Sequence, residues 1–131
     1  MTIFAANEQN PLEIIEAIRD GVDKSEVVRI FDGLDIPVSH VGNYLSLTYR
    51  TFLRKSDNEK MTKQDTEMVY KLYLLKKRGE RIFGNGDAFI DWLNTELQTF
   101  GDRKPAELID TEYGIEMVLT ELGRIEHGIF A

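Results

Sequence analysis

Apolar residues recur at steps of three and four along most of the chain, which is the spacing of amphipathic helices. In the first third, this spacing predicts a helix over residues 11–21. Asp23 and Glu26 have the spacing of a capping box and predict the start of a second helix, which ends near Gly33. The apolar positions of this region are Leu12, Ile15, Ile18, Val22, Val27, Phe31 and Leu34.

The longest apolar stripe extends over about six helical turns. Thr62 with Asp65 predicts its beginning, and Gly84-Asn85-Gly86 predicts its end. Gly79 lies inside the stripe, and a helical glycine costs about 1 kcal/mol relative to Ala. We therefore expect another part of the chain to pack closely against it. The stripe comprises Met68, Val69, Leu72, Leu75, Gly79, Ile82 and Phe83.

The final third predicts shorter helices. Asp87 is a candidate N-cap, Pro105 fits a first helical position, and Thr111 predicts the N-cap of a last helix that ends at Gly128. The alternation of polar and apolar residues that is typical of strands is absent beyond a few residues. The sequence therefore predicts an all-α fold. The apolar positions of these helices are Phe89, Ile90, Trp92, Leu93, Ile115, Val118, Leu119, Leu122 and Ile125.

Residues 37–56 have the pattern of two short helices joined by a tight turn, as in a helix-turn-helix. Gly42 supplies the small side chain that lets the second helix cross closely. Ser46 lies at the turn, where Gly is common because the backbone favours a left-handed conformation. Thr48 predicts the N-cap of the second helix.

The first residues of the second helix in such a unit face base edges in the major groove of DNA. We expect Tyr49, Arg50, Leu53 and Arg54 to face outward. Arg50 has the bidentate chemistry that guanine accepts, and Arg54 or Lys55 could contact phosphate. The alternative is an ordinary helical hairpin with a solvated basic face.

The net charge of −7 is unevenly distributed along the chain. Residues 1–36 carry a balance of −5, residues 37–81 a balance of +5, and residues 82–131 a balance of −7. An acidic protein is repelled by DNA overall, but a local basic face can hold phosphates within a Debye length of about 8 Å. The helix-turn-helix pattern lies in the basic segment.

The composition offers little for catalysis. His40 and His127 are far apart in sequence, and the chain has no Cys, which excludes disulfides and thiolate zinc sites. Gly84-Asn85-Gly86-Asp87 lacks the Lys and Ser/Thr of a P-loop, and no spacing matches a calcium or zinc site. No apolar run approaches the ~18 residues of a membrane span, and no signal peptide is apparent. We expect a cytoplasmic protein that is not an enzyme and needs no cofactor.

The last ten residues, 122–131, end on apolar Ile129, Phe130 and Ala131, with charged Arg124 and Glu126 just before them. Chain ends are usually polar and fray unless contacts hold them. Two interpretations remain open: the tail folds back onto its own core, or it docks into a partner.

Several motifs together resemble the Xre/MbcA/ParS family of antitoxins. The last block is the most specific, because both its residue order and its place at the chain end fit. Tyr49–Lys55 also resembles the family's Arg-Thr-Leu-x-Arg-Arg recognition element, so the resemblance covers residues 37–131. The family's loop after Trp-Leu is only partly retained in residues 94–101. The matching motifs are Ile82-Phe83-Gly84, Ala88, Trp92-Leu93, Pro105-Ala106-Glu107-Leu108-Ile109-Asp110-Thr111, Gly114 and Leu122-Gly123-Arg124-Ile125-Glu126-His127-Gly128-Ile129-Phe130-Ala131.

The resemblance implies an antitoxin encoded beside a toxin, which in this family is often of the RES type and consumes NAD. It implies a helix-turn-helix lobe, which we assign to residues 1–60, and a helical dimerisation and toxin-binding domain, which we assign to residues 61–131. The antitoxin would form a homodimer, repress its own operon by binding operator DNA, and cover the toxin's active site. The alternative is a stand-alone helix-turn-helix regulator without a toxin partner.

The residues implied in each role follow from these motifs. The DNA-binding residues would be Thr48, Tyr49, Arg50, Leu53, Arg54 and Lys55. The toxin-binding residues would be Arg124, Glu126, His127, Ile129, Phe130 and Ala131.

Overall fold

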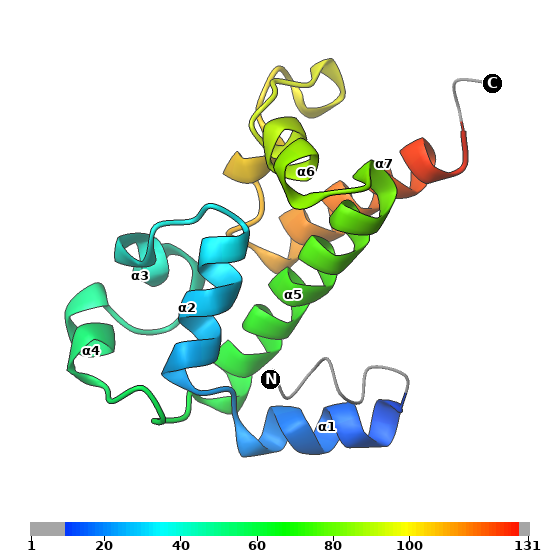
Figure 1. The fold of residues 1–131 in the computed structure, drawn as a ribbon. Coiled ribbons are helices and arrows are strands. Elements are labelled where there is room, and N and C mark those ends of the chain that lie inside the picture. Colours follow the sequence, from blue (N-terminus) through cyan, green and yellow to red (C-terminus); the bar gives the residue numbers. More distant parts are fainter. Residues whose placement is uncertain (1–9, 129–131) are drawn as a thin grey trace. The chain divides into compact units, whose positions relative to one another are not determined.

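The computed structural model describes residues 10–128 and consists of helices joined by short loops (Figure 1). Within that range the only β-type pairings are two isolated bridges, Asp23 with Lys60 and Leu97 with Arg103. The predicted all-α class is confirmed. The chain divides into two compact units, residues 1–70 and 71–131, and the division falls inside one long helix. The domain boundary predicted before residue 61 lies just ahead of that helix and stays a prediction.

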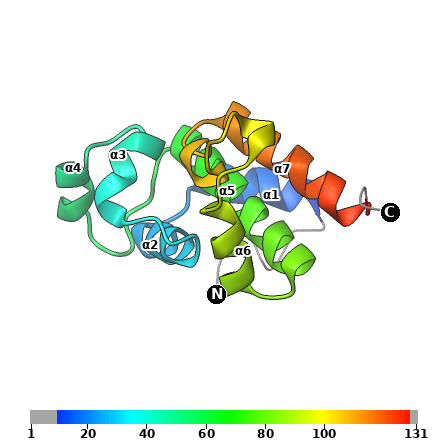
Figure 2. The same cartoon turned by 90° about the horizontal axis from the view of Figure 1, so that it is seen from above.

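Between residues 10 and 70, the part of the first unit that the structure describes contains five helices and the start of a sixth. The short helices α3 and α4 lie beside α2 in both views of the fold (Figures 1 and 2). The elements are α1 (Pro11–Asp20), α2 (Lys24–Gly33), the 3-10 helix η2 (Val38–His40), α3 (Val41–Tyr44), α4 (Tyr49–Arg54) and the beginning of α5 (Lys63–Phe83).

The core of the first unit forms around α2. Phe31 is fully buried, and its ring meets Tyr44 of α3 edge-on with the centroids 5.3 Å apart. Phe52 of α4 is also buried. The backbone N–H of Val22 donates to the buried hydroxyl of Thr66, which ties the start of this core to α5. The predicted inward positions Val27, Phe31 and Leu34 are confirmed.

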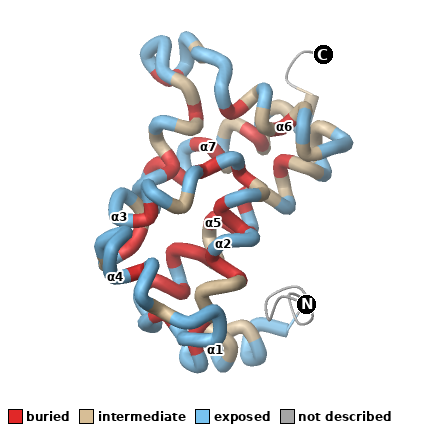
Figure 3. Tube along the Cα trace, turned by 60° about the vertical axis from the view of Figure 1, so that its left-hand side comes forward, coloured by how far each residue is buried: buried red, intermediate tan, exposed pale blue. Residues whose placement is uncertain are grey.

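The predicted helix over residues 11–21 is present as α1, but it buries none of its side chains. Leu12 is 73% exposed and Ile15 is 42% exposed, whereas Ile18 is half-buried, so the apolar stripe of this helix is only partly covered. Figure 3 shows α1 as mainly exposed, in contrast to the buried stretches of α2. An apolar stripe at helical spacing therefore predicted the helix correctly but not its burial.

The second unit contains the remainder of α5 and the C-terminal helices. Its core includes Leu72 and Leu75 of α5, Phe89 of α6, and Ile115 and Leu122 of α7, all of which are buried. Phe83, Phe89 and Trp92 form a ring cluster with centroids 5.6–6.1 Å apart. The elements are α6 (Gly86–Leu93), the 3-10 helices η3 (Gln98–Phe100) and η4 (Pro105–Glu107), and α7 (Glu112–Glu126).

Helix caps account for most of the helix boundaries. The side chains of Asp23, Thr48 and Thr111 each accept a hydrogen bond from a backbone N–H of the helix that follows, as predicted. The prediction for α6 is wrong by two residues, because Asn85 rather than Asp87 is the N-cap. Asn85 has an extended backbone and accepts a hydrogen bond from the N–H of Ala88 over 2.8 Å, while Asp87 lies inside the first turn.

Two glycines of the second unit lie where another part of the chain approaches the helix backbone. A Cβ atom at Gly79 would overlap the ring of Phe89, which confirms the close packing predicted there. A Cβ atom at Gly114 would overlap the carbonyl oxygen of Leu108. At each position the missing side chain lets another group pack directly on the helix.

Candidate functional site

In the first unit, the residues predicted to read DNA lie on α4. Arg50 and Arg54 are exposed, Leu53 is 55% exposed and Tyr49 is 37% exposed, so the predicted outward face is confirmed. Thr48 caps the helix by accepting a hydrogen bond from the N–H of Thr51. The outward face therefore presents two guanidinium groups one helical turn apart, but contact with DNA stays a prediction.

The loop between α3 and α4 differs from the expected turn. Among residues 10–128 only Asp35 and Asp102 have a positive φ without being glycine, so Ser46 is not left-handed. Its N–H instead donates to the buried carboxylate of Asp65 over 2.8 Å. Because this bond replaces the left-handed turn, Ser is accommodated at a position where Gly was expected.

Gly42 lies against this loop, but less closely than predicted. A Cβ atom there would lie 3.5 Å from the carbonyl oxygen of Leu47 and 4.0 Å from the Cα of Thr48. These are ordinary van der Waals distances. The crossing of the two short helices would therefore also admit Ala.

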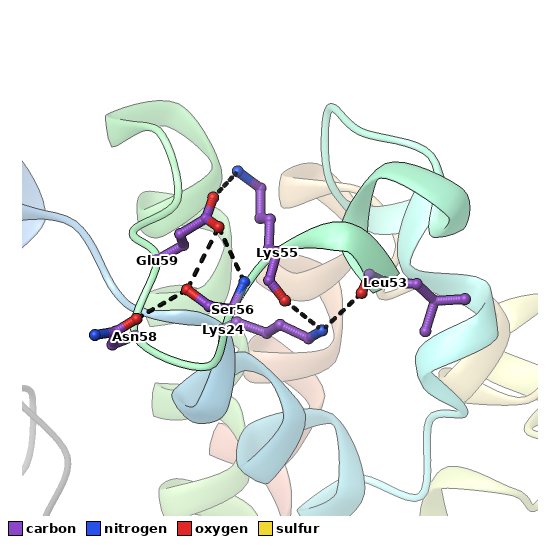
Figure 4. Close-up of polar contacts among 6 residues, drawn as sticks. All are labelled: Lys24, Leu53, Lys55, Ser56, Asn58 and Glu59. Carbon is purple, nitrogen blue, oxygen red and sulfur yellow. Dashed lines mark hydrogen bonds and ion pairs between the residues drawn. The ribbon is translucent and has the colours of Figure 1, made fainter.

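Lys24 of α2 holds the C-terminal end of α4 (Figure 4). Its ammonium group donates to the carbonyl oxygens of Lys55 over 2.9 Å and Leu53 over 3.4 Å. It also lies 5.2 Å from the centre of the Phe52 ring. A cation at the C-terminus of a helix satisfies the last carbonyl groups and complements the helix dipole. The six-residue helix α4 is thus fixed from a neighbouring helix.

The loop after α4 closes around Glu59 (Figure 4). The carboxylate of Glu59 accepts a hydrogen bond from the N–H of Ser56 over 3.0 Å and lies 3.7 Å from the ammonium of Lys55. The backbone bond from Ser56, followed by the nearby charge of Lys55, lowers the pKa of Glu59 against the opposing effect of burial. Lys55 is therefore engaged within the chain, with a side chain only 24% exposed. Its predicted phosphate contact is untested.

In the second unit, the predicted toxin-binding residues gather at the end of α7. Arg124 lies 3.3 Å from Glu121, Glu126 ends the helix, and His127 is the exposed C-cap. Gly128 follows with φ +68°, the left-handed conformation that commonly ends helices. The predicted contacts of Ile129, Phe130 and Ala131 lie outside the described residues.

The carboxylate of Glu126 is bound by two arginines of α5. Its oxygens lie 3.4 Å from Arg78 and 3.2 Å from Arg81. Burial alone would raise the pKa of Glu126, but the charge of Arg81 and the hydrogen bonds from Arg78 and Arg81 lower it. Glu126 thus remains ionised and joins α7 to α5.

A mainly apolar pocket of about 230 Å³ lies beside Arg124. Phe100 of η3 and Met117 of α7 supply its apolar lining. Met117 is 39% exposed, so an apolar part of α7 remains accessible in this unit. The remaining lining residues are Thr99, Thr120, Glu121 and Arg124.

Sequence reasoning missed four residues that shape these two regions: Lys24, Arg78, Arg81 and Gly123. The Lys24 contacts join residues 29 and 31 positions apart, and the Arg78 and Arg81 contacts join residues 48 and 45 positions apart. No local pattern could reveal them. Gly123 did carry a signal, because a glycine inside a helix requires a reason.

Comparisons with known proteins identify sequences that are similar to this chain. Residues 78–128 match the family described as the antitoxin Xre/MbcA/ParS C-terminal toxin-binding domain. A protein named antitoxin Xre from Yersinia enterocolitica is 25% identical over 121 residues, which cover 90% of this chain and 81% of that protein. A second antitoxin Xre, from Photorhabdus laumondii, is 26% identical over 127 residues, which cover 94% of this chain and 76% of that protein.

The matched residues begin at Arg78 and end at Gly128, so they include both sides of the ion-pair cluster at Glu126. They also include α6, the 3-10 helices η3 and η4, and all of α7. Residues 78–128 therefore match the C-terminal toxin-binding domain of the Xre/MbcA/ParS antitoxins, and the chain is similar over most of its length to proteins named antitoxin Xre.

Proposed function

We propose that this chain is the antitoxin of a toxin–antitoxin pair and that it neutralises its toxin through residues 124–131. The toxin is of the RES type and consumes NAD, and the end of the chain covers its active site. The observation that carries the proposal is the match of residues 78–128 to a toxin-binding domain. That match ends directly before Ile129, Phe130 and Ala131.

The negative charge of the C-terminal part of the chain supports binding to a cationic active site. Residues 82–131 carry a balance of −7. Asp87 and Asp91 are exposed one turn apart on α6, and Glu96 is exposed in the loop that follows. An enzyme that binds the phosphates of NAD needs cationic or N–H groups in its active site. Acidic and cationic surfaces attract one another and accelerate encounter. Apolar Ile129 and Phe130 would then supply the buried anchor of the interface.

A truncation after Gly128 tests the role of the tail. It removes Ile129, Phe130 and Ala131 but leaves Leu122 in place, which is fully buried in the core of the second unit. We expect the truncated chain to fold with an unchanged helical circular dichroism spectrum. We also expect it to lose both tight binding to the protein encoded by the adjacent gene and protection of cells that express that protein. Full protection by the truncated chain would contradict the proposal.

We further propose that the antitoxin represses its own operon as a homodimer, with α4 in the major groove. Support comes from the exposed guanidinium groups of Arg50 and Arg54 and from the +5 balance of residues 37–81. The two-fold symmetry of a homodimer matches a palindromic operator with two half-sites.

Two substitutions separate base reading from phosphate contact. Arg50→Ala should cost roughly 1–3 kcal/mol at the operator and relax its sequence preference. Arg54→Ala should weaken all sequences alike and reduce the salt slope of binding by about one. Fluorescence anisotropy on operator and scrambled duplexes measures both effects, and Arg19→Ala on α1 is a charge-matched control. Unchanged operator affinity of the Arg50 variant would show that α4 does not read bases.

The alternative function is a helix-turn-helix regulator that acts without a toxin. The exposed face of α4 favours this alternative, because all residues of that face belong to the first unit. This function requires operator binding that survives the truncation after Gly128. It also requires that expression of the neighbouring gene alone does not harm the cell.

A further inference from the structure

The ion pairs at Glu126 lie at the last residue of α7, directly before the segment assigned to toxin binding. Arg78 and Arg81 are three residues apart on α5, so they project from one face of that helix. Each reaches a different oxygen of the same carboxylate, over 3.4 Å and 3.2 Å. Two contacts from one helix restrict how the end of the other helix can move.

Because Gly123 has no side chain, the side chain of Arg78 can pass close to α7 and reach this carboxylate. A Cβ atom at Gly123 would lie 3.1 Å from a terminal guanidinium nitrogen of Arg78, which is its nearest described neighbour outside the adjoining turns of α7. The guanidinium therefore lies across the bare backbone of α7, less than one turn before Glu126. This contact gives a physical reason for a glycine inside α7, where Ala would favour the helix by about 1 kcal/mol.

The buried part of Arg78 indicates that its position is specific. Its Nε atom is buried and has no hydrogen-bond partner among the described residues. Burying an N–H group without a partner is unfavourable, whereas an Arg on a protein surface can keep all its donors in water. The contact of its terminal nitrogen with the carboxylate of Glu126 offsets the cost of burying the Nε–H group.

We infer that Arg78 and Arg81 are positioning residues for toxin binding. Gly123 contributes to this role because its missing side chain leaves the space in which the guanidinium of Arg78 lies. The two arginines fix the last turn of α7, so that His127 and Gly128 are held in one arrangement at the start of the segment assigned to toxin binding. They act through Glu126 and do not themselves need to contact the toxin. This inference rests on the proposed function, in which residues 124–131 bind the toxin.

Amide hydrogen exchange on the free chain tests the first step. The N–H groups of His127 and Gly128 donate to the carbonyl oxygens of Gly123 and Ile125, so they report the order of the last turn. Arg78→Gln and Arg81→Gln should each speed exchange at His127 and Gly128 by about two- to fivefold, as expected for partly exposed ion pairs. Lys76→Gln removes the same charge from α5, where the ammonium of Lys76 pairs with Glu80 of the same helix over 2.9 Å, and it should leave these rates unchanged. Unchanged rates in both arginine variants would overturn the inference.

Affinity for the protein encoded by the adjacent gene tests the second step. Arg78→Gln and Arg81→Gln should each raise the Kd by about two- to fivefold, because fewer molecules keep the last turn of α7 in the binding-competent arrangement. In a Glu126→Gln background, the same two substitutions should have no further effect. If either one weakens binding equally in both backgrounds, that arginine contacts the toxin directly and its positioning role is wrong.

Substitutions at Gly123 separate positioning from stability. Ala and Leu both favour helix formation over Gly, so Gly123→Ala and Gly123→Leu should keep or raise the melting temperature. They should nevertheless weaken toxin binding, and the larger Leu should do so more, because it blocks the path of Arg78. An affinity for the toxin that Gly123→Leu leaves unchanged would overturn the role inferred for Gly123.

The truncation after Gly128 distinguishes a failure of the positioning role from a failure of the proposed function. If it abolishes tight binding while the arginine and glycine variants bind normally, the inference fails and the proposed function stands. If the truncated chain binds as tightly as the full chain, the tail does not bind the toxin, and both fail.

Discussion

At the scale of single residues, Gly114 has the least room for a side chain among the glycines of residues 10–128. It lies in the first turn of α7, where its N–H donates to the capping hydroxyl of Thr111 over 2.9 Å. The carbonyl oxygen of Leu108 occupies the space that a Cβ atom would need. Because the obstacle is backbone, it cannot turn aside as the end of a flexible side chain can.

Gly114→Ala should therefore destabilise the chain by about 1–3 kcal/mol, the usual cost of inserting a group into a filled site. Gly123→Ala is the matched control in the same helix. The nearest neighbour of Gly123 is the flexible end of Arg78, so this variant should be neutral or slightly more stable. Urea unfolding followed by circular dichroism measures both. Equal stability of the two variants would contradict this account of Gly114.

At the scale of helices, the cap of α6 is the clearest correction to the sequence prediction. Asn85 and Asp87 are both good capping residues, and only the backbone conformation decides between them. Asn85 is extended and accepts the hydrogen bond from Ala88. Asp87 instead contributes a negative charge to the first turn, where the helix dipole favours it.

Asn85→Ala should cost about 1 kcal/mol of unfolding free energy, since it removes the capping bond. Asp87→Ala should cost only about 0.3–1 kcal/mol, and this cost should shrink in high salt because it comes from the helix dipole. Thermal unfolding at low and high salt distinguishes the two. A larger loss for Asp87 than for Asn85 would restore the original assignment of the cap.

Sequence reasoning located the helices well because their signals are local. Asp23, Thr48 and Thr111 were identified as caps from the few residues around them, and the stripe of α5 from its spacing alone. Sequence reasoning failed where a residue's interaction partner lies far away in the sequence. Ser46 was judged by its own turn, although its partner is Asp65. Sequence reasoning also gave Glu126 no partner within the chain, although Arg78 and Arg81 bind its carboxylate there; the toxin contact of Glu126 stays a prediction.

At the scale of the whole molecule, three carboxylates make folding sensitive to acid. The causes for Glu59 and Glu126 are described above. Burial opposes ionisation of Asp23, but hydrogen bonds from Ser25 and Glu26, together with the charge of Lys60, outweigh it and lower the pKa. Carboxyl groups whose pKa is lower in the folded chain stabilise it above their ordinary values of 3.8 and 4.5. That stabilisation disappears as the pH falls through the lowered values.

The unfolding free energy should therefore decrease steadily below about pH 5. Glu126→Gln should reduce the slope of this decrease, because the substituted side chain no longer titrates. Glu96→Gln, in an exposed loop of the same unit, is the control and should leave the slope unchanged. Urea titrations at a series of pH values measure the slope. Identical slopes for the Glu126 variant and the natural chain would contradict the role of this carboxylate.

The exposed helix α1 bears on how a cell could dispose of this protein. Because α1 buries no side chain, a protease could shorten the chain as far as Asp20 without opening the hydrophobic interior. The interior begins at Val22, whose N–H is bound by Thr66 and whose carbonyl accepts from Met61. Digestion from this end would then stall at a folded remnant that keeps α4 and α7 intact. Complete turnover would have to begin elsewhere in the chain.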